Sequence, residues 1–294
     1  MSIFPGIYDL VKNKLHRGTK VSKVTVQNMT QVNNSSLVFF LGGADAEMVA
    51  IRQILESEGV AFCDKNLGWG AAASAYTEEI AQAVSEDKVP VLVELTADIA
   101  LPEGAIEVDH HNANADRPAS ILQVLSLLGL EPTRMQQLIA ANDSGYIPAM
   151  LSLGATAEEV AQVRLLDRNA QGITSEQEAE AERALAAAEV VNGVTIVTMA
   201  HSKTATISDR LFDPEKEQRV LILSGDGESN FFGNGALCRA LQGEDTGAKT
   251  PEGYTIYSHF GGWIGGDLDG KGGFWGGYAD QNEIRDYVEN FFAE

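Results

Sequence analysis

The feature of this sequence that most limits its fold is an alternation of short apolar runs with longer segments of helical periodicity. Apolar runs of strand length lie at residues 37–41, 60–63, 89–95 and 106–108. Between them, residues 46–59 and 71–84 place apolar side chains three or four positions apart. Strands separated by helices of about ten or more residues form parallel sheets that helices cover on both faces. The first half of the chain therefore predicts an α/β fold built on a parallel sheet.

Further helices and a second group of strands follow this region. We expect helices over residues 121–128, 134–142, 154–167 and 175–190, and then strands over 194–199, 219–223 and 254–259 with a helix over 235–241. A glycine-dense loop spans 261–277, and a final helix spans 280–292. These patterns predict a basic N-terminal extension (1–36), a parallel-sheet domain that ends in a helical linker (37–190), and a smaller α/β domain (191–294).

The net charge of −21 is distributed unevenly along the chain. Residues 1–44 hold five basic residues and one acidic residue, a net charge of +4, so the remaining 250 residues carry −25. Proteins hold long duplex nucleic acid with lysines and arginines that neutralise its phosphates, so this balance favours small phosphorylated partners or short single strands. In the basic segment we expect a short helix near residues 8–15 and a strand near 21–26, in preference to an organellar transit peptide.

The composition also disfavours several locations and kinds of site. No apolar run approaches the roughly 20 residues that cross a bilayer, and residues 1–20 lack the apolar core of a secretory signal. The two cysteines, Cys63 and Cys238, have no CxxC spacing, which excludes a thiolate metal site and a disulfide framework. We therefore expect a cytoplasmic protein with no membrane partner. A homodimer is an assembly that the sequence leaves open.

Acidic side chains follow the predicted strands of the parallel sheet. Asp45 and Glu47 come after the first strand, Asp64 follows the second, Glu94 lies late in the third, and Asp109 ends the fourth. The carboxyl ends of parallel strands meet at one edge of the sheet, which is where such folds bind ligands. Carboxylates gathered there repel one another unless a cation lies among them, so we predict a divalent metal site.

Two adjacent histidines, His110 and His111, directly follow Asp109 at the end of the fourth predicted strand. With five histidines in 294 residues, an adjacent pair at a strand end is unexpected by chance. The alternative interpretation is that one histidine caps the strand and the other faces solvent. Imidazole and carboxylate ligands together suit Mn²⁺ or a similar ion better than a structural zinc.

The segment Val108-Asp109-His110-His111-Asn112 resembles the signature of the DHH phosphoesterase superfamily. Its members include single-strand exonucleases, short-oligonucleotide hydrolases, cyclic-dinucleotide phosphodiesterases and family II inorganic pyrophosphatases. Asn142-Asp143-Ser144-Gly145 lies after a predicted helix, where the family places its last metal-binding aspartate. The glycine-rich end and terminal helix resemble the DHH-associated substrate domain. The resemblance covers residues 37–294 and implies a DHH domain joined by a helical linker to a smaller substrate-binding domain.

The resemblance implies a metal site that holds one or two Mn²⁺ or Mg²⁺ ions. Its catalytic residues would be Asp109, His110 and His111. In this scheme Asp109 orients the histidines from outside the ligand set, and His111 contacts the phosphate or helps the leaving oxygen to depart. The implied metal ligands are Asp45, Glu47, Glu94, His110 and Asp143, with Asp64 as a substitute ligand.

The first metal motif departs from the family pattern. The family places His-x-x-x-Asp-x-Asp after the first strand, and this chain has Leu41, Asp45 and Glu47 at those positions. Because a leucine side chain binds no metal ion, three outcomes are open. The site has been rebuilt with Asp64, or it holds a single ion, or catalysis has been lost.

The glycine-dense loop supplies candidates for substrate binding. Glycines let backbone N–H groups approach a phosphate closely, and flat aromatic side chains stack on bases. The alternative is a loop whose aromatic side chains pack in the core. The predicted substrate-binding residues, in this loop and elsewhere, are His111, Asn112, Arg168, His201, Lys203, Arg210, Gly261, Gly262, Trp263, Gly272, Gly273 and Trp275.

These observations predict a hydrolase of phosphodiester or phosphoanhydride bonds in small nucleotides or short oligonucleotides. One alternative is a catalytically inactive nucleotide-binding or scaffolding protein that keeps the DHH fold, and Leu41 favours it. A second alternative is a hydrolase similar to inorganic pyrophosphatase. The missing first-motif histidine and the aromatic side chains of the glycine-dense loop disfavour this second alternative.

Overall fold

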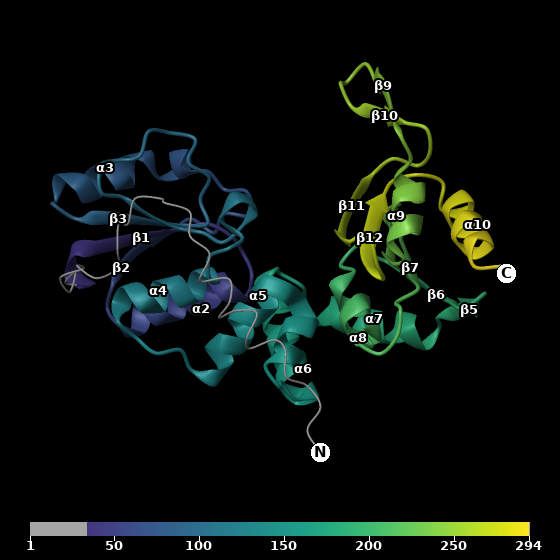
Figure 1. Cartoon of the computed structure of the whole chain (residues 1–294), viewed down its shortest axis with the longest axis horizontal. Helices are drawn as coiled ribbons and strands as arrows, with labels where there is room; N and C mark the ends of the chain where they lie inside the picture. The colour runs from purple at the N-terminus through teal and green to yellow at the C-terminus, as the bar shows by residue number, and fades with distance from the viewer. Residues whose placement is uncertain (1–33, 294) are drawn as a thin grey trace, which may run out of the picture.

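The structure is a computed structural model, and it describes residues 34–293. Figure 1 shows two sheet-containing domains that a group of helices connects. The helix predicted near residues 8–15 and the strand predicted near 21–26 lie outside the described residues, as does most of the basic N-terminal extension. The first described element is a 3-10 helix, η2 (Asn34–Ser36), which leads directly into the first strand.

The first domain is built on a four-stranded parallel sheet with the strand order β2-β1-β3-β4. The central strands, β1 and β3, are apolar along almost their whole length, as strands are when both faces of a parallel sheet are covered. This sheet confirms the predicted α/β fold. Its strands are β1 (Leu37–Leu41), β2 (Ala61–Asp64), β3 (Val89–Val93) and β4 (Ile106–Val108).

Helices cover both faces of this sheet. Phe39 and Leu41 point to the side on which α2, α4 and α5 pack, and Val38 and Phe40 point to the side covered by η3 and α3. The segment 71–84, predicted as one helix, is a 3-10 turn followed by an α-helix. The helices of this domain are α2 (Ala46–Ser57), η3 (Ala73–Tyr76), α3 (Thr77–Ser85), η4 (Asn112–Asn114), α4 (Ser120–Leu128) and α5 (Arg134–Ser152).

Two helices, α6 (Ala157–Ala170) and α7 (Ser175–Ala186), lead from α5 to the second domain. That domain is a mixed six-stranded sheet with the order β11-β12-β8-β7-β6-β5, in which only β6 and β7 are parallel neighbours. The boundary predicted at residue 190 stays a prediction. The strands are β5 (Glu189–Val191), β6 (Val194–Met199), β7 (Val220–Ser224), β8 (Ser229–Gly233), β11 (Trp263–Asp267) and β12 (Gly272–Gly277).

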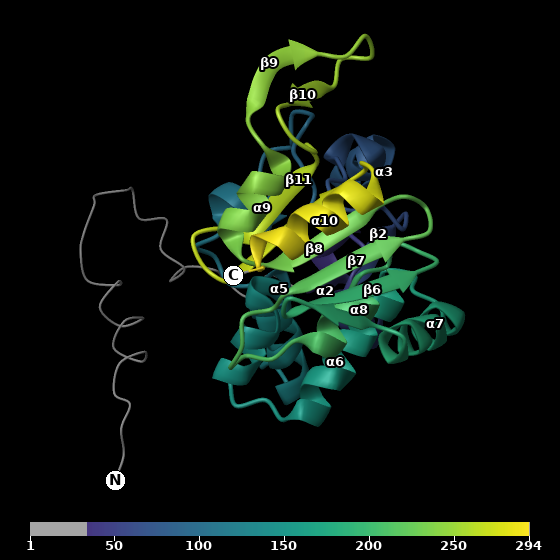
Figure 2. The same ribbon diagram turned by 90° about the vertical axis from the view of Figure 1, so that its right-hand side faces the viewer.

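Helices also cover both faces of the second sheet. α7 and α8 (Ala205–Leu211) pack on one face, and α9 (Gly235–Gln242) and α10 (Gln281–Phe291) pack on the other. Figure 2 shows α9 and α10 on one side of the sheet, with a separate hairpin projecting beyond them. The strands of this hairpin are β9 (Asp245–Lys249) and β10 (Thr255–Tyr257). Among the described helices, none combines the length and apolar character needed to span a bilayer.

The segment predicted as a glycine-dense loop, 261–277, is instead the antiparallel hairpin β11–β12. Glycine is depleted in most strands, and its abundance in this hairpin is explained by close packing against a helix. A Cβ atom on Gly273 would lie 3.0 Å from the Cα of Gly235 and 3.2 Å from Cys238 Sγ, both in α9. The glycines therefore let α9 lie directly on the hairpin.

Candidate metal centre

The carboxyl ends of β3 and β4 form the acidic edge that the sequence predicts. Glu94 directly follows β3, and His110 and His111 lie just after β4. Asp143 joins them from α5. One ligand atom from each of these four residues lies within 4.8 Å of the others. We call the four residues the metal cluster, because their atoms are close enough to share one cation.

His110 lies at the centre of the metal cluster. Its Nε2 atom is 2.5 Å from Asp143 Oδ2, 3.8 Å from Glu94 Oε1 and 3.5 Å from Oε2 of Glu47, a buried residue of α2. All four atoms are buried, and within the described part of the chain they have no hydrogen-bond partner outside this group. Three buried carboxylates crowded around one imidazole are rare, because their oxygens have lost the hydrogen bonds of water. A divalent ion such as Mn²⁺ would give these oxygen and imidazole donors a common partner.

The electrostatics of the cluster show what these atoms do without a cation. Burial, and then the neighbouring charge of Glu47, raises the pKa of Glu94 to about 10. The contact of His110 with Asp143, followed by its contact with Glu47, raises the pKa of His110 to about 10. Metal ions compete with protons for the same lone pairs. A dication at the cluster would therefore compete with the protons that Glu94 and His110 hold.

Asp109 holds His111, a member of the metal cluster, in place. Its Oδ1 atom accepts a hydrogen bond from the backbone N–H of His111 (3.0 Å) and lies 3.1 Å from His111 Nδ1, while Oδ2 accepts one from Asn114 (2.8 Å). Partial burial alone would raise the pKa of Asp109, but these hydrogen bonds outweigh it and lower that pKa. The half-exposed ring of His111 lies 4.2 Å from the ring of His110. Asp109 therefore orients His111 from outside the metal cluster.

The structure does not bring Asp45 or Asp64 into the metal cluster. Asp45 caps α2, with Oδ1 accepting from the backbone N–H of Met48 at 2.9 Å and Oδ2 accepting from Trp69 Nε1 at 3.2 Å. Asp64 forms an ion pair with Arg52. Leu41, at the position of the family histidine, is 1% exposed and packs in the core. Whether Asp45 and Asp64 bind metal stays a prediction.

Unusual backbone conformations place two of the side chains at the site. Glu94 has a φ of 53°, and Tyr146, shortly after Asp143, has a φ of 58°. For residues other than glycine such angles cost roughly 1–3 kcal/mol, and they are concentrated at functional sites. In α5, Gly145 and Tyr146 both leave the helical conformation, and Pro148 has no N–H for the helix ladder. The helix predicted over 134–142 thus continues past a kink, and Asp143 sits just before it.

A cleft of about 790 Å³ opens onto the metal cluster. Most of its lining comes from the first domain, and Phe232 of β8 and Phe274 of β12 line it from the second. Its charged lining is mostly acidic, so a bound phosphate group needs a cation between itself and the walls. Apart from the histidine, the charged residues of the lining are Asp45, Glu94, Asp109, Asp143, Arg164 and Asp167.

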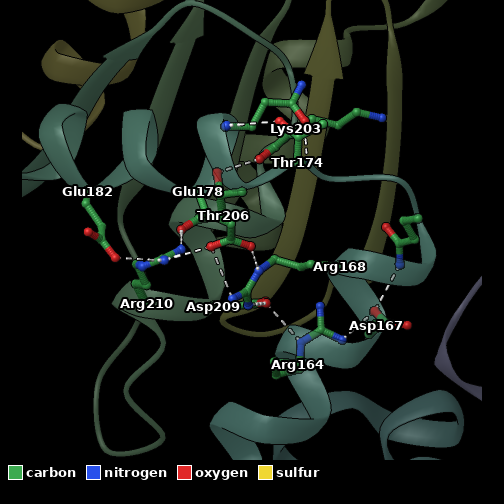
Figure 3. Close-up of polar contacts among 12 residues, drawn as sticks. Arg164, Asp167, Arg168, Thr174, Glu178, Glu182, Lys203, Thr206, Asp209 and Arg210 are labelled. Atoms are coloured by element: carbon green, nitrogen blue, oxygen red, sulfur yellow. Dashed lines mark hydrogen bonds and ion pairs between the residues drawn. The ribbon is translucent and has the colours of Figure 1, made fainter.

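A buried polar network joins the two domains beside this cleft (Figure 3). Asp209 of α8 accepts hydrogen bonds from Tyr146 Oη at 2.6 Å, Arg164 Nε at 3.0 Å and Arg168 Nη1 at 2.6 Å. Both arginines are buried, and their charges are tolerated there because the carboxylates of the network pair with them. Asp209 is therefore the point at which the second domain is fastened to α5 and α6.

Arg164 connects this network to the elements of the metal centre. Its Nη1 atom donates to Asn142 Oδ1 at 2.9 Å and to Asp167 Oδ2 at 2.8 Å. Asn142 directly precedes Asp143 of the metal cluster. The other oxygen of Asp167 accepts the backbone N–H of Ala46, at the start of α2, at 3.1 Å. The network that holds the second domain in place therefore also contacts both α2 and α5.

Most residues predicted to bind substrate lie away from the cleft. The basic candidates are engaged in ion pairs, since Arg168 and Arg210 both contact Glu178 and His201 lies 3.1 Å from Glu180. Their role in substrate binding stays a prediction. His111 and Asn112 line the cleft, and the predicted residues that do not are Arg168, His201, Lys203, Arg210, Gly261, Gly262, Trp263, Gly272, Gly273 and Trp275.

The aromatic side chains of the hairpin divide between core and cleft. Trp275 is fully buried, and its Nε1 donates to the carbonyl oxygen of Gly261 at 2.8 Å, as the core-packing alternative expects. Phe274, the next residue back along the strand, points the other way and lines the cleft. Sequence inspection also missed Trp69 and Arg164, because neither belongs to a motif and only tertiary packing places them at the cleft.

Comparisons with known proteins give a likeness of fold. No family model matches the sequence, and no curated protein matches it. A crystal structure of the exonuclease RecJ bound to manganese aligns with 88% of this chain and 91% of its own, at 12% identity and a TM-score of 0.38. RecJ from Thermus thermophilus, in complex with Mn²⁺, aligns with 88% of this chain and 52% of its own, at 12% identity and a TM-score of 0.34.

The described chain is similar in fold to RecJ exonucleases. The likeness is one of fold alone. What the site of this chain does therefore depends on the side chains and distances described above.

Proposed function

We propose that this chain is a metal-dependent phosphoesterase that hydrolyses phosphodiester or phosphoanhydride bonds in small nucleotides or short oligonucleotides. The observation that carries the proposal is a group of four buried atoms able to bind a metal ion, which lie together without a hydrogen-bond partner outside the group. They belong to Glu47, Glu94, His110 and Asp143. Such a group is costly in a folded protein unless a cation completes it. Its place at the carboxyl edge of a parallel sheet is where α/β folds bind ligands.

The residues of the site divide into ligands and groups that act on the substrate. Glu47, Glu94, His110 and Asp143 would hold the ion. A bound dication supplies Lewis-acid stabilisation of the phosphoryl oxygens and of the charge that develops on them. His111 is half-exposed at the cleft, and its Nδ1 lies 3.1 Å from Asp109 Oδ1. His111 is thereby placed to give a proton to the departing oxygen.

The cleft limits the class of substrate. A volume of about 790 Å³ lies within the range of roughly 300–1,000 Å³ typical of small-molecule sites. Arg164, the arginine of its lining, is already paired with Asp167 and Asp209, so it offers little uncompensated charge to a polyphosphate backbone. A nucleotide or short oligonucleotide, bound through a dication, suits such a cleft better than a long duplex.

One observation favours a second candidate function. Leu41 lies buried at the position where the family has a metal-binding histidine, so the ligand set supports one ion more readily than two. A site with an incomplete ligand set is compatible with a protein that binds nucleotides without cleaving them. The two functions share the metal cluster and differ in turnover.

The test is an assay of the full chain, stripped of metal with a chelator and reconstituted with Mn²⁺ or Mg²⁺. The substrate panel contains a dinucleotide, a cyclic dinucleotide, a short single strand and pyrophosphate. We expect metal-dependent hydrolysis of at least one nucleotide, lost in His110→Ala and kept in His259→Ala, an exposed histidine outside the cluster. Metal and nucleotide binding without turnover would support the binding protein instead. Equal rates for wild type and His110→Ala would refute the site.

A further inference from the structure

An exposed tryptophan lies at the rim of the cleft beside the metal cluster. Trp69 is 74% exposed and lines the cleft, whereas Trp263 is 43% exposed and outside it, and Trp275 is fully buried. Single exposed apolar side chains are common on protein surfaces, so exposure by itself assigns no role. The attachment of Trp69 and its position relative to Glu94 distinguish it from such residues.

The loop that carries Trp69 is fixed on both sides. On one side, the carbonyl oxygen of Leu67 accepts the backbone N–H of Gly43 at 3.1 Å; on the other, that of Ala71 accepts the N–H of Thr96 at 2.8 Å. The indole Nε1 donates to the buried Oδ2 of Asp45. The ring is therefore tethered at one edge while most of its surface stays in water. A ring held in this way loses little conformational freedom when a ligand packs on it.

Gly43 brings the indole and the metal cluster close together. A Cβ atom on Gly43 would lie 3.4 Å from Oε2 of Glu94 and 3.9 Å from Cδ1 of Trp69. Gly43 also has a φ of 116°, which side-chain-bearing residues rarely adopt. The glycine thus leaves the indole edge and the Glu94 carboxylate next to the same point of the backbone, which the methyl group of Met48 also approaches, at 3.6 Å.

We propose that Trp69 stacks on the nucleobase adjacent to the phosphate that the metal cluster binds, which makes nucleotides the substrate class. This inference rests on the proposed function and deepens it. Flat aromatic rings stack on every base through its π-face, so Trp69 selects for a base without reading which base it is. Phe274 offers a second aromatic surface in the same cleft from the other domain. Phosphorylated compounds that lack a base gain nothing from either ring.

Tryptophan fluorescence tests the stacking without any turnover. The chain has three tryptophans, and Trp69 is the most exposed of them. With Mg²⁺ present, AMP should quench the emission of the full-length protein, and inorganic phosphate should leave it unchanged. The quenching should disappear in Trp69→Phe and persist in Trp263→Phe. No quenching by AMP, or the same quenching in Trp69→Phe as in wild type, overturns the proposal.

Kinetics with a dinucleotide separate stacking from the support that Trp69 gives to Asp45. Trp69→Leu removes both the aromatic surface and the N–H, whereas Trp69→Phe removes the N–H but keeps a smaller aromatic ring. We expect KM for a 5′-phosphorylated diadenylate to rise about tenfold in Trp69→Leu and clearly less in Trp69→Phe, since a stacked base is worth a factor of this order. The inhibition constant of inorganic phosphate should stay the same in both variants.

A matched control is Tyr254→Ala, which removes an aromatic side chain of similar exposure (72%) outside the cleft and should leave KM unchanged. Equal increases of KM in Trp69→Leu and Trp69→Phe would assign the effect to Asp45 and refute the stacking. If wild type hydrolyses nothing, the phosphoesterase proposal fails while the fluorescence result still decides whether Trp69 stacks on a base.

Discussion

At the scale of single residues, Glu94 is a buried carboxyl group whose surroundings oppose its ionisation. Its pKa of about 10 means that at neutral pH it is protonated in the metal-free folded chain and ionised in the unfolded chain. A raised carboxyl pKa destabilises the fold progressively as the pH rises above about 4.5, by at most about 3 kcal/mol at pH 7. We therefore predict that Glu94→Gln raises the melting temperature of the metal-free protein at pH 7 and weakens Mn²⁺ binding at least about tenfold.

Calorimetry at pH 5 and pH 7, with and without Mn²⁺, checks this prediction. When metal is absent, the melting temperature of Glu94→Gln should exceed that of wild type by more at pH 7 than at pH 5. Saturating Mn²⁺ should reverse the order of the two melting temperatures. Glu107→Gln, at an exposed position of β4, serves as the control. A Glu94→Gln variant that binds Mn²⁺ as tightly as wild type would remove Glu94 from the ligand set.

At the scale of elements, the glycine-rich hairpin is defined by how closely α9 lies on it. A Cβ atom on Gly235 would lie 2.1 Å from the carbonyl oxygen of Leu268, so any side chain there pushes helix and hairpin apart. We predict that Gly235→Ala destabilises the chain by about 1–3 kcal/mol. Gly272→Ala is the control, because its nearest neighbour would be the Cβ of Asp267 at 3.6 Å. Urea unfolding of the two variants gives the comparison, and equal midpoints would contradict this account of the packing.

At the scale of the whole molecule, Asp209 decides how the second domain sits on the first. It is the common acceptor of Tyr146, Arg164 and Arg168. Asp209→Ala leaves two buried arginines short of a partner, which costs about 3–5 kcal/mol. We also predict a several-fold loss of Mn²⁺ affinity, because Arg164 is bonded to the residue that precedes Asp143.

Thermal unfolding and Mn²⁺ titration of Asp209→Ala measure both effects. Asp213→Ala removes an aspartate whose contacts, an ion pair with the exposed Lys216 and a hydrogen bond from the backbone N–H of Glu215, lie at the surface, and it should change neither the melting temperature nor the affinity. If Asp209→Ala lowers stability but leaves Mn²⁺ affinity intact, the network fastens the domains without supporting the metal centre.

Local patterns in the chain determined much of the first domain. The apolar runs of β1 and β3 predicted a covered parallel sheet, because a strand buried on both faces has no polar positions. Parallel strands end together at one edge of a sheet, so the residues that lie at the ends of β3 and β4 were predicted to meet there. These residues are Glu94, Asp109 and His110. The hairpin β11–β12 was predicted as a loop, since glycine content alone does not distinguish a flexible segment from a tightly packed one.

The sequence by itself therefore determined the sheet and its acidic edge, which follow from periodicity and strand order within short stretches of chain. The Asp-His-His segment was found differently, as an adjacent histidine pair that resembles a known motif. Only the tertiary structure decided which distant residues meet there. Asp167 accepts the N–H of Ala46 from 121 positions away, and Asp209 lies 45 positions from Arg164. Contacts of this kind depend on how helices and domains pack, and packing is a property of the whole folded chain that no local pattern encodes. For the same reason, Trp69 and Arg164 became candidates for function only when their place at the cleft was known.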